Sequence, residues 1–147
     1  MADKEEKPVI SAADYMCEDR ISAEDVVALL EVVDNLKDEI EFLQNDITQV
    51  NRIDAVCVHI NELSDAIFFL IDFTDTAMSL NKVSECLADL KKKPLDKFLP
   101  LMLMPLVEEL ESWLKSVFVD KTADNIYMGE TMIIASSQQI VSSAKAT

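Results

Sequence analysis

Residues 22–50 read SAEDVVALLEVVDNLKDEIEFLQNDITQV, and this stretch decides the fold. Its apolar residues recur at alternating steps of three and four, which places them on one narrow face of an α-helix. One alternate set is β-branched and the other is mostly leucine, the choice that parallel two-stranded coiled coils favour. The stretch therefore predicts a long helix that packs against another helix through Val26, Leu29, Val33, Leu36, Ile40, Leu43, Ile47 and Val50.

The composition extends this prediction to the whole chain. Half of the 147 residues are hydrophobic, enough to bury a core, and the chain has only one glycine and four prolines. Sheets joined by tight turns need more of these residues, because glycine readily adopts the positive φ angles of hairpin turns. The sequence therefore predicts an all-α protein with at least about 80% helix, against the usual third.

The net charge of −15 bears on the partners of the chain. Such a charge is repelled by the phosphates of nucleic acids and of anionic membranes. The three cysteines lie far apart without metal-binding spacing, which fits reduced thiols in a cytosol. The charged start lacks the apolar core of a signal peptide, and the longest apolar run, residues 98–107, is too short to span a bilayer. We expect a soluble cytoplasmic protein that binds neither nucleic acid nor membrane.

Two helix-start signals lie near the N-terminus. Ser11 and Ser22 each precede an aspartate by three residues, as helix N-cap residues often do. They predict an N-terminal tail and short helix within residues 1–21, followed by a helical bundle domain over residues 22–147.

The remaining helices are expected to follow a break at Asn45-Asp46 or at Asn51-Arg52, of which Asn51 is preferred. Their predicted ranges are residues 53–80, 82–93, 105–120 and 130–143, with Pro105 in the first turn of its helix. Residues 66–73 are apolar on nearly every side, so we expect them to be the most buried segment. The predicted architecture is an elongated antiparallel bundle of about four main helices with an N-terminal helical arm.

His59 is the only histidine and therefore the only candidate for histidine chemistry. Histidine phosphotransfer domains present a phosphoacceptor histidine on a helical bundle, characteristically followed by a nearby lysine and, four places on, a small residue. Here Glu62 stands where a positive charge would help, and Leu63 where the small residue is expected. The competing interpretation is a histidine at the edge of the core, paired with Glu62 by helix spacing.

Other catalytic patterns are missing from the sequence. Carboxylate-bridged metal sites use Glu-x-x-His spacing, whereas here His59 precedes Glu62 and no second histidine exists. The chain has no P-loop, nucleophile elbow or Cys–His pair. We therefore expect no catalytic residue, no metal site and no cofactor, and hence no enzyme.

Two sets of residues are candidates for protein contacts. Within residues 98–107, methionines between leucines are compatible with an adaptable groove for a partner helix, although the favoured interpretation is that this run closes the end of the core. The candidate partner-binding residues are Phe98, Leu101, Met102, Met104 and Leu106. On the stripe, the candidate contacts of a homodimer whose subunits share one bundle are Leu36, Ile40, Leu43 and Ile47. The wide apolar face near Val27 and Leu30 favours instead a neighbour within the same chain, so packing within the chain stays an open alternative.

The last quarter of the chain resembles a helical segment of bacterial two-component and chemotaxis-type signalling proteins. The resemblance rests on LESW (residues 110–113), VFV (117–119), ADNIY (123–127) and SSQQI (136–140). In those proteins an Ile-His-Tyr or similar triplet precedes a serine-rich helix that ends in Gln-Ile, and Tyr127-Met128 departs from that triplet. The resemblance implies a signalling context and assigns no catalytic residue.

These observations predict a non-enzymatic signalling or adaptor module that acts through helix–helix association. One alternative is a histidine phosphotransfer protein that uses His59. A second alternative is a purely structural coiled-coil or bundle oligomer, which would have the same scaffold without a docking surface.

Overall fold

The computed structural model describes residues 8–17, 20–48, 51–70, 72–90 and 98–145. Of these residues 82% are helical and none forms a strand, which confirms the predicted all-α bundle. The short α1 (Ala12–Met16) precedes α2 (Ala23–Asn45), α3 (Asn51–Phe69) and α4 (Thr74–Leu90). Helix α5 (Leu99–Leu114) continues into a π-helical turn (Lys115–Val119), and α6 (Met128–Lys145) follows.

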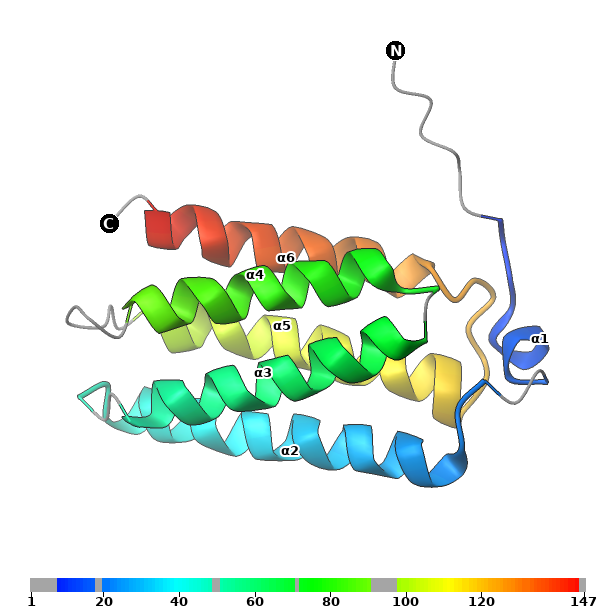
Figure 1. Cartoon of the computed structure of the whole chain (residues 1–147), viewed down its shortest axis with the longest axis horizontal. Coiled ribbons are helices and arrows are strands. Elements are labelled where there is room, and N and C mark those ends of the chain that lie inside the picture. The colour runs from blue at the N-terminus through cyan, green and yellow to red at the C-terminus, as the bar shows by residue number, and fades with distance from the viewer. Residues whose placement is uncertain (1–7, 18–19, 49–50, 71, 91–97, 146–147) are drawn as a thin grey trace, which may run out of the picture.

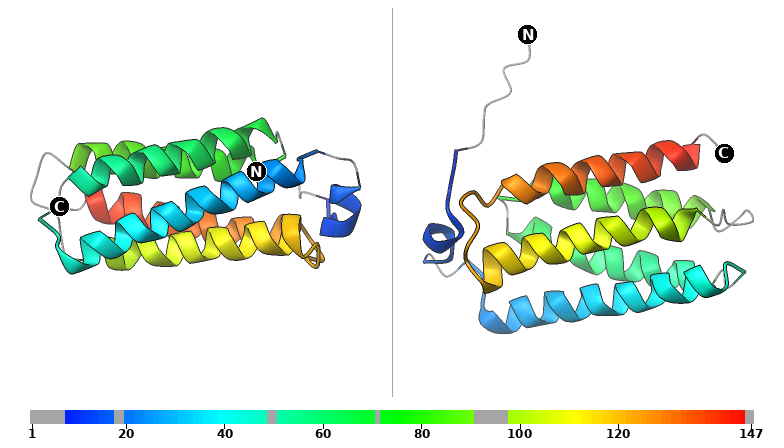
Figure 2. Two further views of the ribbon diagram at one scale, coloured as in Figure 1. Left: turned by 90° about the horizontal axis from the view of Figure 1, so that it is seen from below. Right: turned by 180° about the vertical axis from the view of Figure 1, so that it is seen from behind.

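Within the part of the chain that the structure describes, the five long helices form a closed ring around one core (Figure 1). Helix α2 packs against α3 and α5, α4 packs against α3 and α6, and α5 packs against α6. Neighbours in this ring run antiparallel, except that α4 and α6 run parallel (Figure 2). One parallel pair is required because up and down directions cannot alternate around a ring of five.

Polar contacts between buried groups position α6 in this ring. Thr76 Oγ1 of α4 donates a hydrogen bond of 2.6 Å to Glu130 Oε2 of α6, and both side chains are buried. On the other side, Ser136 Oγ donates to Glu109 Oε2 of α5 at 2.8 Å. Because a buried carboxylate is costly without partners, the Thr76 contact favours one register of α6 against α4.

Both predicted helix starts are confirmed. The Ser11 side chain accepts a hydrogen bond from the backbone N–H of Asp14, and the Ser22 side chain accepts one from that of Asp25. The arm that carries α1 is attached to the bundle by its backbone. Ala12 N–H donates to Ala123 O at 2.9 Å, and Ile126 N–H donates to Ile10 O at 2.8 Å.

The apolar stripe of α2 packs within the chain. Its buried members are Val26, Leu29, Val33, Leu36, Ile40 and Leu43. The predicted break at Asn51 is wrong, because α2 already ends at Asn45, where the Asp46 side chain accepts a hydrogen bond from Thr48 N–H and stabilises a turn. Ile47 therefore lies outside the helix and is half-buried, and Val50 lies outside the described residues.

The stripe residues proposed as dimer contacts are covered by the chain itself. Leu36, Ile40 and Leu43 have no exposed surface, since α3 and α5 pack on either side of α2. The knob positions that suggested a two-stranded coiled coil thus serve the bundle of a single chain. This corrects the prediction that they form a contact between subunits.

The predicted helix over residues 53–80 is also wrong, because the chain turns back between Leu70 and Phe73. In this turn Leu70 N–H donates to Ile67 O at 3.0 Å. The apolar run of residues 66–73 reflects this reversal rather than burial on all sides. Phe73 is completely buried, whereas Phe69 at the end of α3 is 88% exposed.

Helix α5 begins at Leu99, six residues before the predicted start at Pro105. Pro100 lies in its first turn, where a missing N–H costs no helical hydrogen bond. Pro105 lies inside the helix on an exposed side. The C-terminal helix matches its prediction, since α6 contains residues 130–143 and extends two residues beyond each end.

Candidate partner-binding groove

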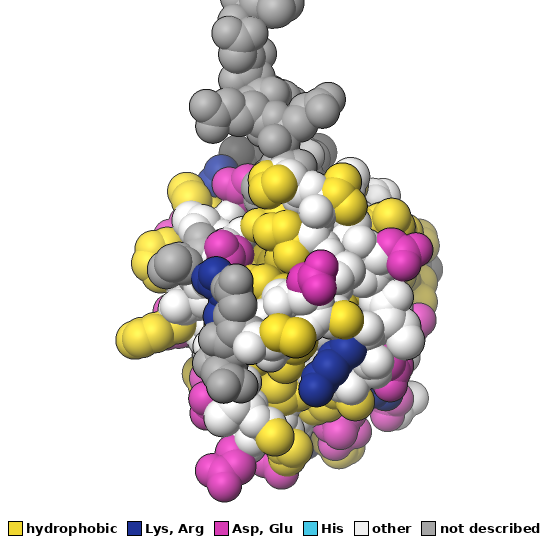
Figure 3. Space-filling view, turned by 90° about the vertical axis from the view of Figure 1, so that its right-hand side faces the viewer, with side chains coloured by type: hydrophobic (Ala, Val, Ile, Leu, Met, Phe, Trp, Pro, Cys, Tyr) yellow, Lys and Arg dark blue, Asp and Glu magenta, His cyan; other side chains and the backbone are white. Residues whose placement is uncertain are grey.

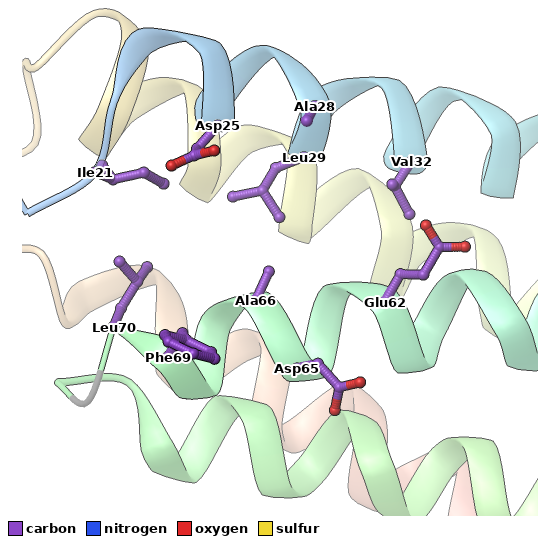
Figure 4. Close-up of a pocket in the computed structure, with 10 residues that line it drawn as sticks. All are labelled: Ile21, Asp25, Ala28, Leu29, Val32, Glu62, Asp65, Ala66, Phe69 and Leu70. Atoms are coloured by element: carbon purple, nitrogen blue, oxygen red, sulfur yellow. The ribbon is translucent and has the colours of Figure 1, made fainter.

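An apolar groove runs between the first half of α2 and the last half of α3, at the end of the bundle where α1 lies (Figure 4). Its volume is about 550 Å³. Its lining residues are Ile21, Asp25, Ala28, Leu29, Val32, Glu62, Asp65, Ala66, Phe69 and Leu70. Its lining residues on α2 run from Asp25 to Val32 and span about 10 Å along the helix axis, which is roughly two turns of a docked helix.

Small side chains create the groove. Ala28 on α2 and Ala66 on α3 carry only a methyl group each and face the space between the two helices (Figure 4). Leu29 and Leu70 are buried and belong to the core, so they close the groove from inside. Phe69 forms a wall of it and is the most exposed large hydrophobic side chain among the described residues.

The charged side chains of the groove are acidic. Asp25 lies near Ile21 at one end, and Glu62 reaches toward Val32 at the other (Figure 4). Asp65 contributes a third carboxylate, and none of the ten described residues that line the groove is basic. Figure 3 views the molecule from the end that carries α1, where hydrophobic, acidic and some basic side chains are interspersed.

A polar junction fixes the mouth of the groove. Asp72 Oδ2 accepts hydrogen bonds from Tyr15 OH at 3.1 Å and from Arg20 Nη1 at 3.0 Å. Because Arg20 precedes Ile21 and Asp72 lies just beyond Leu70, these contacts hold the two walls together. Burial raises the pKa of the Tyr15 hydroxyl above its ordinary value, and the neighbouring Asp72 charge raises it further.

His59 lies on α3, one turn before Glu62. Its Nδ1 is 3.4 Å from Glu62 Oε1, so the predicted pairing by helix spacing is present. The His59 side chain is 20% exposed, and its Nδ1 is enclosed without a hydrogen bond. A phosphoacceptor must offer a ring nitrogen to an incoming phosphoryl group, and because this Nδ1 is covered, only Nε2 could serve. Phosphotransfer through His59 stays a prediction.

The predicted partner-binding residues of α5 lie at the other end of the bundle (Figure 1). Phe98 and Leu101 are exposed, while Met102 and Met104 are half-buried. Leu106 is only 1% exposed and packs in the core, so it is corrected from a partner contact to a core residue. The structure does not bring these residues to the α2–α3 groove.

Sequence reasoning missed the groove itself. Ala28, Ala66 and Phe69 belong to two helices, and nothing in the local pattern of either helix indicates that they will line one groove. The one signal in the sequence was Phe68-Phe69. Adjacent residues of a helix point in different directions, so two neighbouring aromatic side chains cannot both point into the core.

Two further findings concern other kinds of site. Within the described part of the chain, no three His, Cys, Asp or Glu side chains gather as metal ligands would. None of its helices combines the length and the apolar character that crossing a membrane requires.

Comparison of the chain with protein-family models, with curated proteins and with solved structures found no match.

Proposed function

We propose that this protein is a non-enzymatic adaptor that binds a helix of a partner protein in the α2–α3 groove. The observation that carries the proposal is the exposed Phe69 side chain beside an apolar groove long enough for roughly two helical turns. Burying an aromatic side chain of this kind stabilises a complex by about 1.5–3 kcal/mol. Large exposed apolar surfaces with polar rims are typical of protein-binding sites.

The mode of binding is helix-in-groove recognition, in which an amphipathic helix lays its apolar face between two helices of its receptor. Ala28 and Ala66 allow the backbone of the bound helix to approach closely, and Phe69 packs against its side. The resemblance of residues 110–140 to two-component and chemotaxis-type proteins supports signalling as the setting of this adaptor.

A groove-filling variant tests the proposal. Ala28→Trp places a large side chain in the groove from an exposed position, so the fold is expected to be retained. Ala88→Trp on the exposed face of α4 adds the same side chain away from the groove and serves as the matched control. Wild type and A88W, used to capture proteins from a cell extract, should retain a helical partner that A28W loses. Capture of the same partners by A28W and wild type would show that the groove is not the binding site.

A further inference from the structure

We infer that the groove selects a positively charged amphipathic helix, with basic side chains on both flanks of its apolar face. This inference rests on the proposed function, since it names the chemistry of the partner that the groove accepts. Its basis is the rim, where Asp25 and Glu62 stand at opposite ends of an apolar floor and Asp65 adds a third acidic residue whose carboxylate points toward α4 (Figure 4). None of the ten described lining residues carries a positive charge.

The positions of the carboxylates specify where the partner needs its basic groups. Asp25 lies on the α2 side near Ile21, and Glu62 lies on the α3 side opposite Val32 (Figure 4). Residues 25 and 32 are separated by about 10 Å along the α2 axis, or roughly two helical turns. A helix lying between α2 and α3 would therefore place one Lys or Arg on each flank, about two turns apart.

The net charge of the chain favours a basic partner helix over a second copy of the chain as the occupant of the groove. With a net charge of −15, two copies repel each other as they approach, and their acidic rims would face one another in a symmetric contact at the groove. A basic helix is instead attracted before contact forms. Charge complementarity therefore favours a basic partner over self-association at this surface.

The rim acts mainly by excluding the wrong partners. Exposed ion pairs add little to affinity, whereas an acidic helix would bring like charges together at both ends of the groove. We expect basic and acidic helices with the same apolar face to differ in dissociation constant by about tenfold or more at low salt. The difference should shrink at high salt, which screens exposed charges beyond a few ångströms.

Three synthetic amphipathic peptides test the inference with the full chain. They share one leucine and alanine face and carry Lys, Gln or Glu at the flanking positions. Fluorescence anisotropy at low salt and at about 0.5 M salt should rank their affinities Lys above Gln above Glu, with convergence at high salt. Ala28→Trp should weaken binding of all three, since it fills the shared apolar site.

A pair of double variants separates the rim from the overall charge. Asp25→Asn with Glu62→Gln removes two rim charges, and Asp38→Asn with Glu41→Gln removes two exposed charges of α2 outside the groove. The rim variant should lose most of the preference for the Lys peptide, and the control should keep it. Equal loss in both variants would overturn the inference and assign the preference to the net charge.

The remaining outcomes distinguish this inference from the proposed function. Equal affinity for the three peptides, with binding still lost in A28W, would overturn the charge selection and leave the groove as a docking site. No A28W-sensitive binding of any peptide would overturn both. Self-association of the wild type that A28W abolishes, measured by sedimentation equilibrium, would make a second copy the occupant and overturn the inference.

Discussion

At the scale of single residues, Gly129 shows how closely the elements of this bundle approach each other. It is the only glycine of the chain and lies in the first turn of α6. A Cβ atom at this position would meet Trp113 Cδ1 at 2.8 Å. Trp113 is held by a hydrogen bond of 2.9 Å from its Nε1 to Ile126 O and by edge-to-face contact with Phe73. Glycine is therefore required because the backbone of α6 lies against the Trp113 side chain, and not because the chain turns at this position.

Gly129→Ala should destabilise the protein by about 1–3 kcal/mol, because the added methyl group overpacks a site whose neighbour cannot easily move. This cost should exceed the gain of up to about 1 kcal/mol that alanine brings to a helix. Urea unfolding followed by tryptophan fluorescence measures it, with the exposed Ser142→Ala on α6 as the control that should change little. A stabilised G129A would show that Trp113 shifts freely.

Tyr15 should make stability fall in alkaline solution. Because burial and Asp72 raise its pKa in the folded state, the folded chain keeps the hydroxyl proton at a pH where the unfolded chain has lost it. Stability is therefore fully present below the ordinary tyrosine pKa of about 10 and is lost as the pH rises above it. Tyr15→Phe should flatten this decline, measured from urea midpoints between neutral and alkaline pH. Parallel declines in the two proteins would contradict the assignment.

At the scale of the helices, side chains in the middle of α2 are more deeply buried than those at the end of α3. Leu36 is completely enclosed between neighbouring helices, whereas Leu70 follows the last residue of α3 and is 8% exposed. The apolar run of residues 66–73 had suggested the opposite order. The helix that the sequence identifies first is thus also one of the best-packed elements.

Leu36→Ala should therefore destabilise the protein more than Leu70→Ala. A cavity in the middle of a helix surrounded by others costs about 2–5 kcal/mol, and a site at a helix end can relax toward the missing atoms. Urea midpoints with unchanged slopes give the comparison. A larger loss for Leu70→Ala would mean that the turn after α3 contributes more to stability than its burial indicates.

Local rules predicted much of this architecture. The stripe of α2 and the caps at Ser11 and Ser22 depend only on spacing within a few residues, and each is present in the structure. The turn after Leu70 was not predictable in this way. It contains neither glycine nor proline, and Asp72 is held by Tyr15 and Arg20 from more than 50 positions earlier in the chain. The groove was missed for the same reason, since Ala28 and Ala66 come to line one groove only after α2 and α3 have paired.

At the scale of the whole molecule, the closed ring explains why a coiled-coil pattern does not require a second chain. Each long helix has two neighbours from the same chain, and the α2 stripe is covered by them. A homodimer therefore stays a prediction that would need another surface. The alternative of a purely structural oligomer gains no support from the α2 stripe, because the stripe residues are already buried within one chain.

Stability should accordingly be independent of protein concentration. If the stripe is buried within one chain, dilution removes none of its contacts, so urea midpoints at widely different concentrations should agree. Ile40→Asp should unfold the chain at every concentration, because it places a charge in the core. A midpoint that rises with concentration would reveal a subunit contact that contributes to folding.

The closure of the ring by α6, the last helix described, has a consequence for synthesis on the ribosome. Helix α6 fills the space between α4 and α5 but follows both in the chain, so the ring cannot close until α6 has left the exit tunnel. Until then the faces that later cover Ile133 and Ile140 are open to water and to other nascent chains. A chain shortened before Met128 should therefore be retained by chaperones and degraded, because its helices can form while its core remains open on one side.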